Sequence, residues 1–259
     1  MNELALFAGA GGGILGAKLL GWRTVCAVEK EPYCREILLR RQRDGVLPVF
    51  PIWDDVRTFD GQPWRGLVDV VSAGFPCQPF SFAGKRQGAD DDRNLWPETI
   101  RIIREVGSRY ALLENVPGLL NHDYFGEILG DLAAAGFDAE WDVVSAASVG
   151  ARHRRDRLWV VATNTDSQSQ SQYTGPVDAE VASSQEPIPD ASGKGLEGQR
   201  DGARSAGTEE PMPASGGGWS AEPGVGRVAH GVAHRVDRLK SIGNGQVPAV
   251  VARAWISGR

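Results

Sequence analysis

The sequence predicts an α/β fold in which a mostly parallel, twisted sheet carries helices on both faces. Short apolar runs alternate with amphipathic, charge-bearing segments over residues 1–163. A glycine-rich turn follows the first apolar run, and a proline–cysteine turn follows the fourth. Strands that alternate with helices are joined by crossovers, which place successive strands parallel to one another.

The predicted elements follow from apolar spacing. Strands are predicted at Leu4–Phe7, Thr24–Val28, Val49–Ile52, Val68–Val71, Tyr110–Leu113, Trp141–Val144 and Leu158–Val161. Helices are predicted at Ile14–Leu20, Pro32–Arg41, Pro97–Val106 and Tyr124–Ala135. A last helix is expected from about Ala249 to Ile256, because Pro248 suits a first helical turn.

Composition divides the chain into three regions. Residues 1–163 hold the predicted sheet. Residues 164–234 are rich in Ser, Gln, Gly and Pro, and between residues 165 and 234 the 10 acids and 4 Lys/Arg give a net charge of −6. Few branched apolar residues and surplus acid predict a small, largely irregular insert there. Residues 235–259 form a short third region that ends in the last predicted helix.

Charge and cysteine content narrow the function classes. A net charge of −5 provides no global basic surface, so a nucleic acid would be bound by local patches. Cys26, Cys34 and Cys77 have neither CxxC nor zinc spacing, which predicts no metal site and a reducing compartment. The N-terminus lacks a basic region followed by an apolar run and a cleavage site, so no signal peptide is expected, and no apolar stretch approaches the ~18 residues that span a bilayer. A cytoplasmic protein without a membrane partner is therefore expected.

Three acidic or glycine-rich positions predict a nucleoside-binding site. The turn Phe7–Gly13 permits a close backbone approach to a ligand, although a tight turn without a ligand is the alternative. Glu29 ends the second strand, where an acid can hold two ribose hydroxyls or simply be a solvated carboxylate. Asp55 follows the third strand and could accept a hydrogen bond from an adenine amino group.

Cys77 and Glu114 are the candidate reactive residues. Cys77 lies in the turn Gly74–Ser81, where its thiolate would be a nucleophile, whereas a lone cysteine is often a small buried apolar residue. Glu114 follows an apolar strand, and its alternative role is a surface ion pair. Because ligands bind at the carboxyl edge of open α/β sheets, both are expected at that edge.

These motifs occur in a consistent order. They are Phe7-Ala8-Gly9-Ala10-Gly11-Gly12, Glu29, Asp55-Val56, Gly74-Phe75-Pro76-Cys77-Gln78, Glu114-Asn115-Val116, Arg155-Asp156-Arg157 and Gly243-Asn244. Together they resemble the DNA cytosine-5 methyltransferase family. The resemblance covers residues 1 to about 163 and 235–259. It implies a Rossmann-like methyltransferase fold and methyl transfer from S-adenosyl-L-methionine to a flipped-out cytosine in double-stranded DNA. Residues 164–234 would then be the target-recognition insert, and 235–259 would pack back onto the catalytic domain.

The resemblance also implies residue roles. Cys77 would be the nucleophile, Glu114 its acid partner, and Arg155 and Arg157 would hold the target nucleotide. Phe7 would stack on the adenine or line the methionine pocket. The cofactor site would further comprise Ala8, Gly9, Gly11, Gly12, Glu29, Asp55, Pro76 and Asn244.

The chemistry explains why these residue types are needed. Carbon 5 of cytosine is a poor nucleophile, and addition of the Cys77 thiolate at carbon 6 loads electron density onto it. Glu114 at ring nitrogen 3 would neutralise the developing charge, which predicts a partly buried site that raises its pKa. The base must leave the duplex stack for this reaction.

Two surface features have predicted roles. The long polar loop Phe80–Trp96 is expected to be a lid over the flipped base, with an ordinary surface excursion as its alternative. The basic cluster Arg152–Arg157 is expected to bind phosphate. Within it, Arg152 and His153 depart from the family, which usually has proline and glutamine there.

Other readings stay open. The short acidic insert is compatible with recognition of a very short target sequence, or with a decayed recognition lobe that needs a partner. A cognate restriction endonuclease is a separate candidate partner. An RNA (tRNA) cytosine-5 methyltransferase with the same core is a second enzyme reading. A non-catalytic cofactor- or DNA-binding module is the third reading. A monomer is expected.

Overall fold

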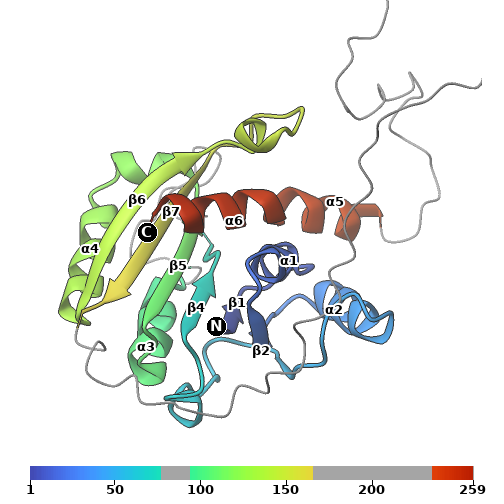
Figure 1. The fold of residues 1–259 in the computed structure, drawn as a ribbon, viewed down its shortest axis with the longest axis horizontal. Coiled ribbons are helices and arrows are strands. Elements are labelled where there is room, and N and C mark those ends of the chain that lie inside the picture. Colours follow the sequence, from blue (N-terminus) through green and yellow to red (C-terminus); the bar gives the residue numbers. More distant parts are fainter. Residues whose placement is uncertain (77–93, 166–234, 259) are drawn as a thin grey trace, which may run out of the picture. The chain divides into compact units, whose positions relative to one another are not determined.

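The computed structural model describes residues 1–76, 94–165 and 235–258 (Figure 1). These residues belong to one compact unit. Cys77, most of the predicted lid and nearly all of the predicted insert lie outside the described residues. None of the helices within the described ranges is long and apolar enough to cross a bilayer.

A seven-stranded sheet in the order β3-β2-β1-β4-β5-β7-β6 forms the centre of the fold. The strands are β1 (Asn2–Leu6), β2 (Arg23–Val28), β3 (Ile52–Trp53), β4 (Val70–Ala73), β5 (Tyr110–Asn115), β6 (Phe137–Val144) and β7 (Arg157–Asn164). The helices are α1 (Gly12–Leu19), α2 (Pro32–Arg43), α3 (Trp96–Val106), α4 (Tyr124–Ala134), α5 (Arg235–Asn244) and α6 (Pro248–Ser257). The mostly parallel α/β fold predicted from the sequence is therefore confirmed.

Several elements differ from the prediction. Strands β6 and β7 are longer than predicted, beginning at Phe137 and ending at Asn164 respectively, and α5 and β3 also differ. Helix α5 includes the Gly243-Asn244 motif at its C-terminal end. No helix was predicted there, because its mostly polar sequence gives little apolar spacing. Strand β3 pairs only through Ile52 and Trp53, so the apolar residues at 49–51 belong to the connection before it.

Strand β7 is the strand that breaks the parallel arrangement. It is antiparallel to both β5 and β6, because β6 and β7 follow one another without a crossover helix. The β5–β7 register pairs Glu114 with Trp159 and Asn115 with Leu158. The beginning of β7 therefore lies at the same edge of the sheet as the carboxyl ends of the parallel strands.

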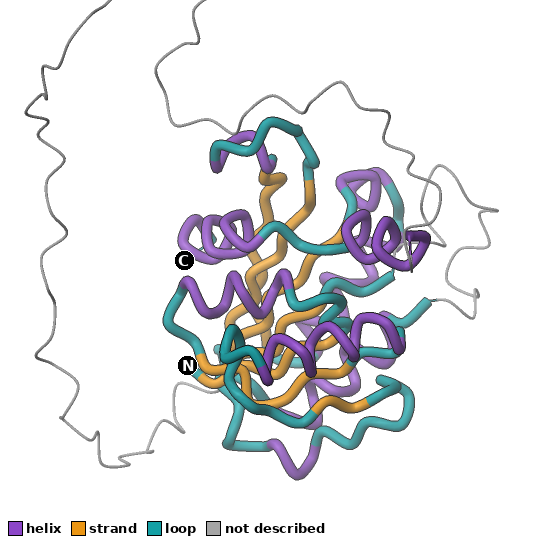
Figure 2. Tube along the Cα trace, turned by 90° about the vertical axis from the view of Figure 1, so that its right-hand side faces the viewer, coloured by secondary structure: helices purple, strands orange, loops and turns teal. Residues whose placement is uncertain are grey.

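Helices cover both faces of the sheet (Figures 1 and 2). Helices α3 and α4 contribute Ile103 and Ile128 to a buried cluster on one face. On the other face, α6 contributes Trp255 and α2 contributes Leu38 to two further clusters. Alternate residues of β1 face opposite layers: Leu4 and Leu6 pack in the first cluster, and Ala5 packs with Leu38.

Helix α6 attaches the C-terminal region to this core. The Trp255 ring makes edge contacts with Trp22 and Tyr110, at centroid distances of 4.7 and 5.2 Å. At Gly16 of α1, an added Cβ would lie 2.5 Å from Val251 Cβ and 2.8 Å from the Pro248 carbonyl oxygen. The two helices therefore cross at a position where only glycine fits.

One carboxyl group is fully buried inside the sheet. Glu3 accepts hydrogen bonds of 2.6 Å from the hydroxyls of Thr24 and Ser72, which lie on the two strands that flank β1. Burial raises the pKa of Glu3 above its ordinary value, and the two hydroxyls oppose this effect.

Replacing Gly16 with alanine is expected to lower the free energy of unfolding by roughly 1–3 kcal/mol, because the new methyl group overpacks the α1–α6 crossing. The matched control is Gly130→Ala in α4, where an added Cβ would meet nothing within 4 Å. This control should raise the free energy of unfolding by up to about 1 kcal/mol through helix propensity. Urea denaturation measures both. Equal effects of the two substitutions would contradict the close approach of α1 and α6.

Replacing Glu3 with glutamine is expected to stabilise the protein increasingly as pH rises. The folded-state pKa of Glu3 is raised, so its contribution to stability is present below its unfolded pKa and is lost as pH rises through its folded pKa. Glutamine does not ionise. Its side-chain oxygen accepts from one of the two hydroxyls, and its NH₂ group can donate to the oxygen of the other. Between about pH 5 and about pH 8, the free energy of unfolding of the variant, measured by denaturation, should rise relative to that of the wild type. The exposed control Glu36→Gln should show no such trend. A difference in free energy of unfolding between Glu3→Gln and the wild type that is the same at both pH values would refute the argument.

Candidate functional site

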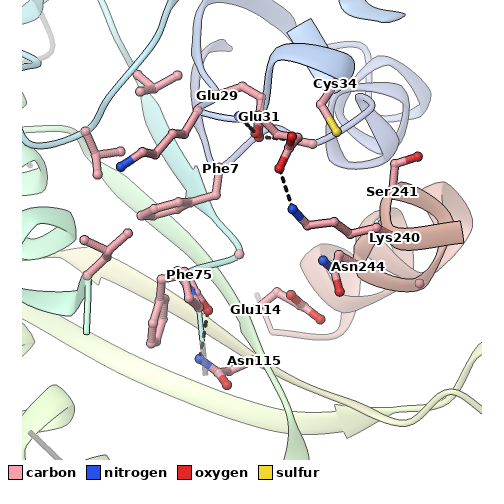
Figure 3. A pocket seen from close by; sticks show the side chains of 18 of the residues that line it. Phe7, Glu29, Glu31, Cys34, Phe75, Glu114, Asn115, Lys240, Ser241 and Asn244 are labelled. Carbon is pink, nitrogen blue, oxygen red and sulfur yellow. Dashed lines mark hydrogen bonds and ion pairs between the residues drawn. The ribbon is translucent and has the colours of Figure 1, made fainter. Parts of the chain in front are cut away.

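A cavity of about 610 Å³ opens at the carboxyl edge of the parallel strands (Figure 3). It lies where the chain reverses its strand order, between β1 and β4, which is the usual ligand position in open α/β sheets. Its lining includes the predicted site residues Phe7, Gly9, Glu29, Asp55, Pro76, Glu114, Arg155, Arg157 and Asn244. The structure thus brings together residues that are far apart in the sequence.

Glu29 joins two walls of the cavity. Its Oε2 accepts a hydrogen bond of 2.6 Å from the Gly9 N–H, and its Oε1 accepts one of 2.7 Å from the Glu31 N–H. Burial raises the pKa of Glu29, and these two backbone donors oppose the rise. Each oxygen keeps a further lone pair, so the carboxylate can still accept hydrogen bonds from ribose hydroxyls.

Asp55 provides an ionised acceptor at the same cavity. Its Oδ1 accepts a hydrogen bond of 3.0 Å from the Arg57 N–H, and its Oδ2 lies 3.2 Å from Lys30 Nζ. The Arg57 N–H, followed by Lys30, lowers the pKa of Asp55. Asp55 therefore suits an amino group as its ligand. Lys30, which the sequence analysis did not include in the site, lines the cavity beside it.

Two residues with unusual backbone conformations line the cavity. Phe7 has a φ of 53° and Arg155 a φ of 38°. Within residues 1–76, 94–165 and 235–258, they are the non-glycine residues with positive φ. Such strain is commonly found at functional sites, where surrounding structure holds it in place. No motif in the sequence indicates it.

The glycine-rich turn divides into two parts. Gly9 has a φ of +54° and lines the cavity. Ala8, Gly11 and Gly12 are not among the lining residues. An added Cβ at Gly11 would lie 2.8 Å from Leu38 Cδ2, and one at Gly12 would lie 2.2 Å from the Gln246 carbonyl oxygen. In this structure these two glycines make room for protein neighbours, so their predicted contact with a cofactor stays a prediction.

Glu114 lines the cavity from strand β5. Only 12% of its side chain is exposed, and its Oε1 lies 2.9 Å from Arg157 Nε. Its carboxylate also receives a hydrogen bond from the side chain of Gln246. Burial raises the pKa of Glu114 although Arg157 and Arg155 lower it. A partly buried position that raises the pKa of Glu114 was predicted from the sequence, and the structure agrees in both burial and direction.

The two arginines of the Arg155-Asp156-Arg157 motif have different partners. Arg155 Nη2 donates a hydrogen bond of 2.6 Å to the Gly245 carbonyl oxygen, and Arg157 holds Glu114. Burial, followed by the neighbouring Arg157, lowers the pKa of Arg155. Arg152 and His153, at the start of the basic cluster, are exposed.

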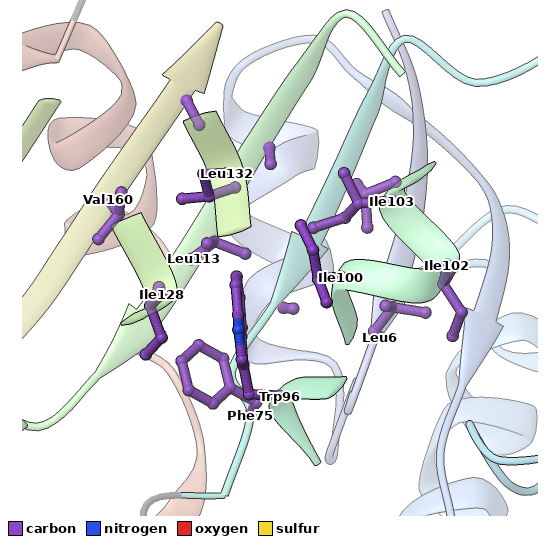
Figure 4. Packing of buried hydrophobic residues seen from close by; sticks show 14 of the residues in the cluster. Leu6, Phe75, Trp96, Ile100, Ile102, Ile103, Leu113, Ile128, Leu132 and Val160 are labelled. Atoms are coloured by element: carbon purple, nitrogen blue, oxygen red, sulfur yellow. The ribbon is translucent and has the colours of Figure 1, made fainter. Parts of the chain in front are cut away.

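Below the cavity, aromatic packing supports the segment that leads to Cys77 (Figure 4). The Phe75 ring lies 5.3 Å from the buried Trp96 ring, centroid to centroid. Asn115 Nδ2 donates a hydrogen bond of 3.3 Å to the Phe75 carbonyl oxygen. Pro76 is the last described residue before Cys77 and lines the cavity, whereas Cys77 itself lies outside the described residues.

Helix α5 forms the remaining wall and holds residues that the sequence analysis missed. Lys240 donates to the Glu31 carboxylate and so ties α5 to the start of α2. Cys34 lines the cavity from α2. Burial raises the pKa of its thiol to about 11, so it is a poor nucleophile. Only the Gly243-Asn244 motif indicated this wall. In the part of the chain that the structure describes, no group of His, Cys, Asp and Glu side chains could hold a metal ion.

An α/β sheet that gathers acidic nucleoside-type acceptors and a buried carboxyl group at one edge is suited to bind a nucleoside-containing cofactor. A family model for C-5 cytosine-specific DNA methylases matches residues 1–204. The chain belongs to this family. Its members take their methyl group from S-adenosylmethionine. The acceptors Glu29 and Asp55 fit the ribose hydroxyls and the adenine amino group of this cofactor.

Similar proteins support the assignment to the family. The type II methyltransferase M.NgoMIV of Neisseria gonorrhoeae is 37% identical over 64% of this chain and 52% of its own length. M.Eco47II of Escherichia coli is 37% identical over 63% of this chain and 39% of its own length. A solved structure of Spodoptera frugiperda DNMT2 covers 68% of this chain and 52% of that one at 22% identity, with a TM-score of 0.52, and shares the fold. The chain thus spans about half or less of the length of these relatives.

Replacing Glu29 with glutamine is expected to weaken binding of S-adenosylhomocysteine roughly ten- to hundredfold. The amide NH₂ of glutamine would oppose one of the two backbone N–H donors, and a hydrogen bond to a charged group contributes about 1.5–3 kcal/mol. Isothermal titration calorimetry measures the affinity. The control Glu36→Gln, on the exposed side of α2, should bind as the wild type does. An unchanged affinity in Glu29→Gln would remove Glu29 from the cofactor site.

Proposed function

We propose that this protein transfers a methyl group from S-adenosylmethionine to carbon 5 of cytosine in double-stranded DNA. One observation carries the proposal: a single cavity holds both the nucleoside-type acceptors Glu29 and Asp55 and the buried, arginine-bound Glu114. The residues that would bind the cofactor and the proposed catalytic acid thus line the same cavity. Membership of the C-5 cytosine-specific DNA methylase family supports this reading.

Cys77 is the proposed nucleophile. Its thiolate would form a bond to carbon 6 of the flipped cytosine, while ring nitrogen 3 takes a proton or a strong hydrogen bond. The resulting enamine has a nucleophilic carbon 5. S-adenosylmethionine, when bound, would supply an electrophilic methyl group. Loss of the carbon-5 proton to a base then lets the sulfur leave as carbon 6 regains its double bond.

Glu114 is the proposed acid at ring nitrogen 3. Burial raises its pKa, which favours a protonated or proton-sharing carboxyl group near neutral pH. Arg157 holds one carboxyl oxygen at 2.9 Å and so limits the directions in which the group can point. The carboxyl group is therefore oriented before the target cytosine binds, so it does not need to reorient during the reaction.

Arg155 and the exposed Arg152 and His153 are proposed to contact the DNA. Arg155 lines the cavity and would act on the target nucleotide, and the exposed groups lie beside it in the chain and suit phosphate. Target recognition by residues 164–234 and the lid at Phe80–Trp96 remain predictions. A cytoplasmic location, a monomeric state and a companion restriction endonuclease also remain predictions.

A trapping experiment tests the proposed function. Duplex DNA that contains 5-fluorocytosine should form a covalent adduct with the wild type in the presence of S-adenosylmethionine, because fluorine blocks the loss of the carbon-5 substituent. Cys77→Ala should form none. Glu114→Gln should methylate ordinary duplex DNA roughly 10²- to 10³-fold more slowly, the range for loss of one group that stabilises developing charge.

Controls separate the alternatives. Both variants should still bind S-adenosylhomocysteine, which excludes misfolding. Tritium transfer to tRNA but not to duplex DNA would move the assignment to an RNA methyltransferase. Cofactor binding without transfer to either nucleic acid would identify a binding module instead.

A further inference from the structure

We propose that Gln246 is a positioning residue for Glu114, the second group that sets the orientation of this carboxyl group. The Gln246 side chain donates a hydrogen bond to Glu114. An added Cβ at Gly74 would lie 2.9 Å from Gln246 Nε2 and 3.0 Å from Glu114 Oε2, so the amide nitrogen and this oxygen lie beside the same point. Arg157 holds the other oxygen, Oε1.

The beginning of α1 is shaped to accept Gln246. An added Cβ at Gly12 would lie 2.2 Å from the Gln246 carbonyl oxygen, and one at Gly13 would lie 2.3 Å from its Oε1. Neither glycine lines the cavity. The glycine pair thus leaves space for both the backbone and the amide of Gln246.

The backbone on both sides of Gln246 is held in place. Before it, the Gly245 carbonyl oxygen accepts the 2.6 Å hydrogen bond from Arg155. After it, Pro248 begins α6, which packs against α1 at Gly16. A short segment between two anchored points has little freedom, so its amide can hold a partner in one orientation.

The chemical consequence concerns the proton of Glu114. An N–H donor to a carboxylate favours the ionised form, so Gln246 opposes the effect of burial. The charged groups that act on Glu114 within the described residues are Arg155 and Arg157, and the neighbouring β4 and α1 segments present glycines. Gln246 is therefore the uncharged donor that both orients the carboxyl group and tunes its proton affinity.

Gln246→Met removes the donor with little change in side-chain length. In the protein without cofactor, ¹³C NMR of labelled Glu114, assigned by the loss of its signal in Glu114→Gln, should give a titration midpoint at higher pH than in the wild type. Methyl transfer to duplex DNA, which rests on the proposed function, should fall roughly ten- to hundredfold, as for loss of a hydrogen bond to a charged group. The alkaline limb of the pH–rate profile for methyl transfer should move to higher pH. Binding of S-adenosylhomocysteine should be retained, because Gln246 does not line the cavity.

Gly13→Ala should also disrupt the hydrogen bond from Gln246 to Glu114, because the added methyl group would occupy the space of the Gln246 amide. The added methyl group displaces only the end of the Gln246 side chain, and alanine favours the helix, so folding should be retained. The matched control is Gln42→Met on α2, which removes an amide hydrogen bond of 3.0 Å to the Phe50 carbonyl oxygen. This control should leave the Glu114 midpoint and the rate as in the wild type.

The outcomes are distinguishable. An unchanged Glu114 midpoint in Gln246→Met and Gly13→Ala would overturn the proposal, and so would a shift equal to that of Gln42→Met. A wild type that transfers no methyl group would refute the proposed function, while the NMR midpoint would still decide the role of Gln246.

Discussion

The buried carboxyl group of Glu114 is the constraint on which the site depends. A carboxylate taken out of water is costly unless charged and polar partners compensate for the lost hydration. The chain supplies those partners from two distant segments: Arg157 at the start of β7 and Gln246 ahead of α6. The antiparallel placement of β7 and the docking of the C-terminal region can both be understood as ways to reach this one group.

The C-terminal region completes the cavity although residues 164–234 separate it from β7 in the sequence. Helix α5 closes one wall through the Lys240–Glu31 ion pair. Helix α6 is fixed by aromatic contacts of Trp255 and by its close approach to Gly16. Because most of this attachment is apolar and close-packed, it can hold Gln246 in place where an exposed ion pair alone would contribute little.

Much of the site could be predicted because its residues follow strands. Glu29, Asp55 and Glu114 each come at or after a strand end, and the carboxyl ends of parallel strands meet at one edge. Gln246 and Lys30 could not be found in this way, because neither residue type nor spacing distinguishes them from surface polar residues. The positive φ of Phe7 likewise depends on surrounding packing and carries no signature of its own.

The amino-acid sequence alone determined the α/β class, the order of most elements and the set of candidate reactive residues, since these depend on local periodicity and on short motifs. The tertiary structure alone decided how the glycines are used and which groups touch Glu114. The expected contact of Gly12 with a cofactor stays a prediction, and the structure adds that its missing side chain accommodates the Gln246 backbone. The contact between Gly12 and Gln246 joins residues more than 200 positions apart, and it arises only when α6 packs against α1 in the folded core.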